Sequence, residues 1–322
     1  MSDIRLCTTA LALALLPSIS GTVWAQAYPV KPIRVVTAQV GGSQDFGIRL
    51  LAPNLTTALG QQVVVENRSG GTIGGEIVSK AAPDGYTLIY SGTIFWTLPL
   101  MRKVAPYDVL KEFTPVTMAT QAPLIFVVHP AVPAKSVKEF IALAKAKPGS
   151  LNYGTGGVGS SNHLAAELFK SMAGVDITTV QYRGSGGGVI GLMGGEVQMM
   201  ITSTGSVTPH IKSGRVRALA VTSSEPSALV PGLPTMAASG VPGYESTQKA
   251  GLFAPAKTSP AVVTRLNREM VTLLRRPDMK EKFFGDGVET VGSTPQELGT
   301  LVKSEIERIG RIIKAVGITA TE

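Results

Sequence analysis

The sequence predicts an α/β protein whose parallel sheets carry helices on their faces. Short apolar strand signals alternate with amphipathic helix signals, and this alternation occurs twice along the chain. Glycine-rich turns follow several of the strands directly. A strand–helix–strand order implies parallel pairing, because parallel neighbours need a crossover connection that a helix supplies. This pattern is compatible with two sheets that are joined where the chain crosses twice between them.

The first alternating set begins with a strand at residues 33–36. After a glycine turn, apolar residues recur at helical spacing over 46–59, and Gly60 ends that helix. The β-branched run at 63–65 predicts a buried strand, and residues 86–90 predict another after a turn. These elements predict the first parallel sheet.

The second set opens with an apolar strand at residues 124–128. Ser136 and Glu139 predict a capping box at the start of the next helix, and Thr294 and Glu297 predict another at the start of the last helix. The remaining elements are predicted as strands at 151–153, 178–181, 197–201, 216–222 and 252–254, and as helices at 162–172 and from 260.

Residues 1–25 are predicted to be a cleaved secretory signal peptide. Arg5 gives a weakly positive start, residues 10–16 form an apolar run, and Val-Trp-Ala at 23–25 suits a signal peptidase. The run is too short to span a membrane, and a buried N-terminal helix is the alternative. The only cysteine, Cys7, precedes the run, so the mature chain has no thiol for a disulfide, a metal site or a nucleophile.

The charge balance is basic, with 30 Lys and Arg against 22 Asp and Glu and a net charge of +8. The basic residues are scattered and no basic run is interleaved with aromatics, so we expect no nucleic-acid partner. A diffuse positive field suits small organic anions instead.

Sequence motifs for catalysis are missing. The chain contains no H-E-x-x-H, Walker A, G-x-S-x-G or calcium-loop sequence, so we expect no enzyme, no metal and no cofactor. His129 and His210 stand beside prolines and are interpreted as structural. His163 follows a glycine loop, where it either faces a ligand or forms hydrogen bonds with polar groups of its own loop.

Three glycine loops follow strands and precede helices, at residues 41–45, 154–161 and 184–188. Such a turn points backbone N–H groups and the positive end of a helix dipole at one place, which suits a carboxylate or a phosphate. The alternative is that each loop is only a tight turn. Hydroxyl donors are added by Ser43, Thr155, Ser160 and Ser161.

A nucleotide-binding loop is the competing interpretation. Residues Gly154–Gly159 satisfy G-x-G-x-x-G between a strand and a helix, which would suit an exported oxidoreductase or another enzyme with a nucleotide cofactor. Against it, Gly186–Gly191 matches equally well, and Asp176 precedes the next strand instead of ending it. The sequence therefore favours anion binding.

The chain resembles the Bug family, the substrate-binding proteins of tripartite tricarboxylate transporters, over nearly its whole mature length. The resemblance is carried by Gly41-Gly42 with Asp45, by His163-Leu164-Ala165, and by the segments at 28–34, 64–68, 81–88, 133–137, 151–153, 209–212, 217–222 and 292–295.

This resemblance implies a two-lobed periplasmic-binding-protein fold, type II-like, with a hinged cleft. Residues 26–123 plus 249–322 would form lobe 1, and 124–248 would form lobe 2. It also implies a monomeric periplasmic protein that delivers a small carboxylate to a membrane permease or a sensor. The ligand contacts that it implies are Gly41, Gly42, Ser43, Gln44 and Asp45 from lobe 1, and Gly156, Gly159, Ser160, Ser161, Tyr182, Arg183 and Gly184 from lobe 2.

Departures from the family pattern bear on the ligand. Thr202 and Ser203 stand where the family often has Asp-Asn, which disfavours a ligand with an ammonium group. Around Thr93 the family has small or polar residues, whereas Phe95 and Trp96 stand here. If these aromatics face the cleft, we expect an acid with an apolar or aromatic body; the alternative is that both pack in the core.

We expect the mature chain to begin at Gln26 or, failing that, at Tyr28, because signal peptidase reads the small residues before the cut. Intact-mass measurement of the protein from a periplasmic extract checks this. Full-length protein that keeps Met1 and stays in the cytoplasm would contradict it.

Overall fold

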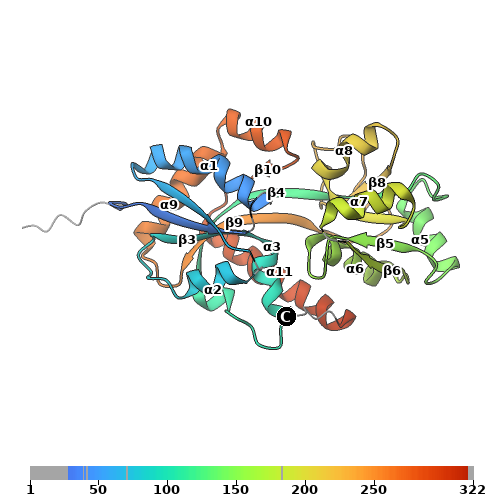
Figure 1. Cartoon of the computed structure of the whole chain (residues 1–322), viewed down its shortest axis with the longest axis horizontal. Helices are drawn as coiled ribbons and strands as arrows, with labels where there is room; N and C mark the ends of the chain where they lie inside the picture. The colour runs from blue at the N-terminus through green and yellow to red at the C-terminus, as the bar shows by residue number, and fades with distance from the viewer. Residues whose placement is uncertain (1–27, 39, 41–42, 70–71, 183, 318–322) are drawn as a thin grey trace, which may run out of the picture.

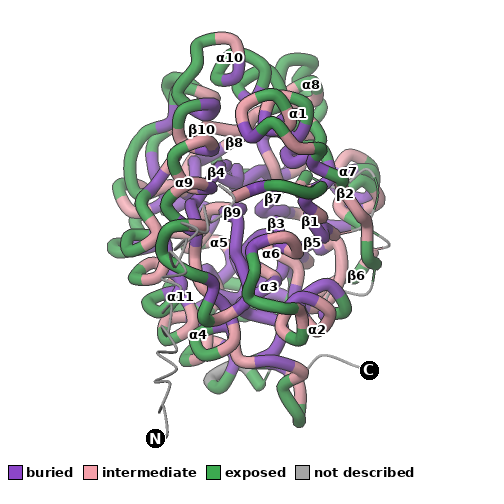
Figure 2. Tube along the Cα trace, turned by 90° about the vertical axis from the view of Figure 1, so that its left-hand side faces the viewer, coloured by how far each residue is buried: buried purple, intermediate pink, exposed green. Residues whose placement is uncertain are grey.

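The computed structural model describes residues 28–38, 40, 43–69, 72–182 and 184–317, so the predicted signal peptide lies outside the described residues. Two α/β lobes are joined by strands β4 and β9, which run between them (Figure 1). In Figure 2 the central strands are largely buried, and the outward surfaces of the helices are exposed. Within the described ranges, every helix is too short or too polar to span a lipid bilayer.

The first lobe contains a mixed sheet in the order β2-β1-β3-β9-β4, with β10 paired to β4. Strands β1, β2 and β3 are parallel, as the strand–helix alternation predicted, and β9 is antiparallel to β3. The strands are β1 Ile33–Thr37, β2 Val63–Asn67, β3 Thr87–Gly92, β4 Phe113–Val128, β9 Thr247–Pro255 and β10 Glu289–Thr290.

Helices cover both faces of this sheet. Helices α1, α9 and α10 pack on one face, and α2, α3, α4 and α11 on the other. Their bounds are α1 Ser43–Leu59, α2 Ile73–Ser79, α3 Thr93–Thr97, the 3-10 helix η1 Leu98–Met101, α4 Val109–Glu112, α9 Pro260–Leu274, α10 Pro277–Gly285 and α11 Pro295–Val316.

The second lobe repeats the plan with the sheet order β4-β7-β5-β6, and β8 pairs with β4. Helices α5 and α6 pack on one face, and α7 and α8 on the other. The elements are α5 Val137–Ala146, β5 Asn152–Thr155, α6 Ser161–Ala173, β6 Thr178–Gln181, α7 Ser185–Gly194, β7 Met199–Ser203, α8 Thr204–Lys212 and β8 Arg217–Val221.

Strand β4 is longer than the sequence pattern predicted. The expected strand began at Leu124, but β4 begins at Phe113 and pairs with β9 as far as Pro123. The sequence pattern did not predict a strand over this stretch because it contains Pro115 and Pro123, and proline is normally confined to strand edges and bulges. The β4–β9 register indeed shifts just after Pro115.

The strand directions place the carboxyl ends of both sheets opposite each other. Gly92, at the end of β3, pairs with Ala250 near the start of β9. Ser203, at the end of β7, pairs with Leu124 where β4 enters the second lobe. The carboxyl ends of β1 and β3 therefore face those of β5, β6 and β7, and α/β sheets bind their ligands at such ends.

The last helix contacts both lobes. Its predicted capping box is confirmed, with Thr294 accepting from the Glu297 N–H and Glu297 accepting from the Thr294 N–H. Farther along α11, Ile309 and Ile313 cluster with Leu164 of α6. The C-terminal segment thus also packs on the second lobe, and the residue boundaries of the two lobes stay a prediction.

Replacing Phe126 with alanine should lower the free energy of unfolding by about 3–5 kcal/mol, because the fully buried ring packs against Phe140 and Phe169. Urea unfolding followed by circular dichroism measures this. Phe284, which is 46% exposed, provides the control, and Phe284→Ala should change stability little. Equal losses in both variants would contradict the packing described here.

Candidate functional site

The candidate site lies where four helices begin beside the carboxyl ends of the strands. Helices α1, α6, α7 and α8 each follow a strand, respectively β1, β5, β6 and β7. Their first N–H groups lack partners within the helix and carry partial positive charge. Both lobes therefore direct anion-binding groups towards the space between them.

Asp45 fixes the start of α1 in place. Its carboxylate is 4% exposed and accepts hydrogen bonds from Arg49 Nε at 2.7 Å and from Asn67 Nδ2 at 2.7 Å. Asn67 Nδ2 also donates to the carbonyl of Ala38 at 2.8 Å. Asp45 therefore ties the start of α1 to the end of β2. Gly41 and Gly42 of that loop lie outside the described residues.

The second glycine loop is held by its own polar groups. Ser160 caps α6 by accepting from the His163 N–H at 3.3 Å, and its hydroxyl donates to the carbonyl of Gly157 at 2.8 Å. The Gly159 N–H donates to His163 Nδ1 at 3.2 Å. Of the two interpretations of His163, the structure supports the one in which its side chain forms a hydrogen bond within its own loop. Ser160 and Gly159 likewise shape the loop.

The second and third loops pack against each other. The Gly184 N–H donates to the carbonyl of Gly156 at 3.3 Å, and a Cβ added at Gly156 would lie 2.8 Å from the backbone nitrogen of Ser185. Glycine is therefore required at 156 by close backbone approach. Gly184, with φ +82°, precedes the first residue of α7, and Arg183 lies outside the described residues.

Tyr182 turns along α7 instead of lying over its start. Its ring occupies the space beside Gly187 and Gly191, and its hydroxyl donates to Glu196 at 2.9 Å. The glycines of α7 make room for this ring. The Tyr182 side chain thus has a packing role in the described structure, which the sequence pattern did not reveal.

The start of α6 carries a buried donor that sequence analysis missed. Asn162 is 4% exposed, and its Nδ2 has no hydrogen-bond partner among the described residues. A buried amide without a partner costs free energy, so the group is suited to a ligand acceptor. Asn162 lies next to Ser161, which the sequence predicted as a ligand contact. The only sequence signal for Asn162 is its position in the first turn of α6.

The hydroxyls that end β7 bond locally. Thr202 is fully buried with Oγ1 3.3 Å from Ser206 Oγ, and Ser203 donates to the same Ser206 oxygen at 3.0 Å. Thr93, at the start of α3, is 8% exposed and accepts from the Lys249 N–H at 3.4 Å. Thr202 is therefore enclosed and bonded locally, whereas Ser203 is half-buried just before α8, and a ligand contact by either hydroxyl stays a prediction.

Phe95 and Trp96 lie in the core of the first lobe, each 1% exposed. The Phe95 ring packs 4.9 Å from Phe113 and 5.2 Å from Phe253. Phe113 and Phe253, strand residues distant in sequence, enclose the Phe95 ring, and its contact with a ligand stays a prediction. Both side chains pack in the core, as the alternative interpretation of these aromatics predicted.

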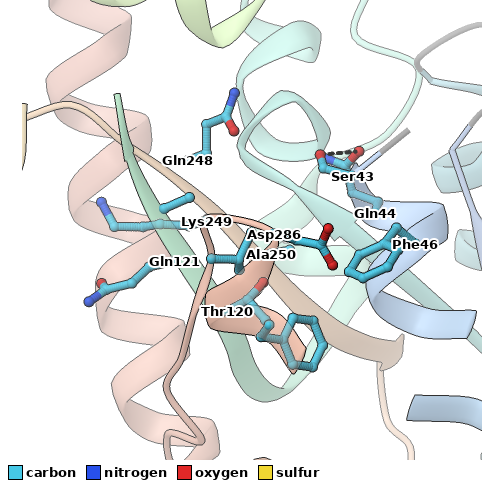
Figure 3. Close-up of a pocket in the computed structure, with 12 residues that line it drawn as sticks. Ser43, Gln44, Phe46, Thr120, Gln121, Gln248, Lys249, Ala250 and Asp286 are labelled. Atoms are coloured by element: carbon cyan, nitrogen blue, oxygen red, sulfur yellow. Dashed lines mark hydrogen bonds between the residues drawn. The ribbon is translucent and has the colours of Figure 1, made fainter. Parts of the chain in front are cut away.

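A cavity of about 300 Å³ opens where the crossing strands pass the start of α1 (Figure 3). Ser43 and Gln44 are the predicted site residues that line it, and the Ser43 hydroxyl donates to Gln44 Oε1 at 3.4 Å. The other lining residues are Phe46, residues 120–122 of β4, residues 248–250 of β9, and Phe283, Asp286 and Val288. In the part of the chain that is described, no group of three or more His, Cys, Asp or Glu residues could hold a metal ion.

Comparison with known sequences shows one family. The family model described as "Tripartite tricarboxylate transporter family receptor" matches residues 48–318. BugT of Bordetella pertussis is 37% identical over 305 residues, covering 93% of this chain and 93% of that protein. A UPF0065 protein in the tcbD-tcbE intergenic region of Pseudomonas sp. is 36% identical over 316 residues, covering 97% and 94%.

Solved structures with the same fold include ligand complexes. R. palustris Rpa4515 with adipate has a TM-score of 0.78 and 34% identity, covering 91% of this chain and 99% of that one. MatC from Rhodopseudomonas palustris with bound malate has a TM-score of 0.75 and 30% identity, covering 89% and 100%. The periplasmic binding protein BugD has a TM-score of 0.75 and 30% identity, covering 91% and 100%.

His163 should make the stability of the protein depend on pH. Burial lowers its pKa from the ordinary value of 6.5, Glu167 opposes this shift, and Lys170 adds to it. The folded state thus binds the proton more weakly than the unfolded chain, so the free energy of unfolding should fall as the pH drops below 6.5.

Urea unfolding between about pH 5 and pH 8 measures this dependence, a range set by the ordinary titration of histidine. His163→Asn keeps an acceptor for the Gly159 N–H but does not titrate, so this component of the pH dependence should disappear. His210→Asn should retain it. An unchanged profile in His163→Asn would show that the imidazole is not the responsible group.

Proposed function

Because the chain belongs to the tripartite tricarboxylate transporter receptor family, we propose that it captures a small organic acid between its lobes and passes it to a membrane permease or a sensor. The observation that carries the proposal is that the start of α1 lines a cavity beside the crossing strands, while the strand directions place the starts of α6, α7 and α8 at the facing edge of the second lobe. Helix N-termini bind carboxylates through backbone N–H groups and the helix dipole.

The carboxylate class is supported by two relatives. The proteins of similar fold that hold adipate and malate share about a third of their residues with this chain. In this chain, the first turn of α6 adds Asn162 Nδ2, which has no hydrogen-bond partner among the residues that the structure describes. A donor of this kind suits a carboxylate oxygen better than a ligand ammonium group.

We place the protein in the periplasm, exported by the signal peptide at its N-terminus. The support is the charged, apolar and small-residue order of residues 1–25, together with the periplasmic relative BugD. We also propose that it performs no chemistry on its ligand, in agreement with the binding roles of its relatives.

The nucleotide interpretation is less favoured. The backbone of α7 packs against Gly156 within the Gly154–Gly159 loop, and the Gly159 N–H already bonds His163. A pyrophosphate needs a loop whose backbone it can approach closely and whose N–H groups point at it. Incubation with nicotinamide cofactors should therefore give no binding.

Calorimetry with the mature protein should detect binding of an organic acid without product formation. A ligand held at about 100 times its dissociation constant stabilises the fold by about 2.7 kcal/mol, so a thermal-shift screen of organic acids can find it. Binding of amino acids alone, with no response to any organic acid, would contradict the proposal.

Substitution at Gly156 tests the convergence of the loops. Gly156→Ala places a Cβ against the Ser185 nitrogen and should displace the start of α7, whereas Gly186→Ala meets nothing within 4 Å. Loss of one hydrogen bond to a charged group costs about 1.5–3 kcal/mol, which corresponds to a roughly tenfold or greater loss of affinity. Equal affinities in the two variants would remove these loops from the site.

A further inference from the structure

We propose that the cavity between α1 and α10 selects the body of the ligand: it takes an acid with one carboxylate and a ring or branched apolar body, and it disfavours a second carboxylate. This inference rests on the proposed function, because it assumes that the acid group is held by helix N-termini at the facing edges of the two lobes. Three lining residues carry it, namely Phe46, Phe283 and Asp286.

Two aromatic rings form an apolar wall of the cavity. Phe46 lies in the first turn of α1, one residue after Asp45, and its ring is 6.2 Å from that of Phe283 at an interplanar angle of 82°. Phe283 is 1% exposed, whereas Phe46 is 39% exposed. Phe46 therefore presents its exposed ring to an apolar ligand in a concave site, and the buried Phe283 supports that ring from behind.

The size of the cavity suits a ring. Its volume of about 300 Å³ is roughly twice the 150 Å³ of an engineered apolar cavity that holds benzene. A ring with one carboxylate thus fits and can cover Phe46. A short, unbranched diacid would leave that aromatic surface in contact with water.

The charges around the cavity favour a ligand with one carboxylate over a ligand with two. Lys249 lines the cavity, but its Nζ lies 3.5 Å from both Glu245 and Glu305, and its side chain is 5% exposed. In Figure 3 its amino group points away from the Asp286 carboxylate. The lysine charge is therefore compensated by the protein itself.

Asp286 presents a carboxylate to the same cavity. It is exposed, and no described residue forms an ion pair with it. A second ligand carboxylate beside it would meet a like charge without a cation to offset the repulsion. A neutral hydroxyl on the ring can instead donate to Asp286, so hydroxylated ring acids are compatible with this end.

The test compares benzoate, 4-hydroxybenzoate and terephthalate with succinate and malate by calorimetry of the mature protein. Wild-type protein should bind benzoate and 4-hydroxybenzoate in preference to terephthalate, which adds only a second carboxylate to the same ring. Phe46→Ala should weaken the binding of the ring acids about tenfold or more, because the ring of the ligand loses its apolar contact. Phe284→Ala removes a phenylalanine that is 46% exposed and does not line the cavity, so it should leave affinity unchanged.

Asp286→Asn removes the like charge and should therefore strengthen the binding of terephthalate about tenfold relative to the binding of benzoate. The selectivity proposal is overturned if wild-type protein prefers the short diacids, or if both cavity variants leave the order of affinities unchanged while acids still bind. If no acid binds to protein with a native circular dichroism spectrum, the proposed function fails and the inference fails with it.

Discussion

Strand β4 pairs with β9 over its first part and with β7 and β8 over its second, so one run of backbone belongs to both sheets. The same run lines the cavity at residues 120–122, opposite residues 248–250 of β9. Thr222 reinforces the crossing, because its buried hydroxyl accepts from the Leu124 N–H and donates to the carbonyl of Ser246. The position of the lobes and the floor of the binding site therefore depend on one set of backbone hydrogen bonds.

Side chains bonded within the protein hold the start of α1 and the loop before α6. Asp45 is bonded to Arg49 and Asn67, while His163 and Ser160 hold the loop before α6. These side chains act through the backbone that they position. Groups that are already held in place lose little conformational entropy on binding a ligand.

Two buried charges beside the cavity, Lys249 and Glu305, belong to a network of opposite charges. Lys249 of β9 lies between Glu245 and Glu305, and Arg308 donates to Glu305 at 2.8 Å. Burying a charge is costly unless it is paired, and the attraction between Lys249 and the two glutamates offsets the cost of removing them from water. Through Glu305 and Arg308, the network also connects the crossing strand to α11, whose later residues pack on the second lobe.

The sequence by itself determined the strand–helix alternation, the three glycine loops and the last capping box, because each depends on residues within one or two turns of each other. Only the tertiary structure decided which aromatics reach the cavity. Phe95 and Trp96 are enclosed by strands from elsewhere in the chain, while Phe46 meets Phe283 from α10. Burial depends on such distant partners, and no local pattern records them.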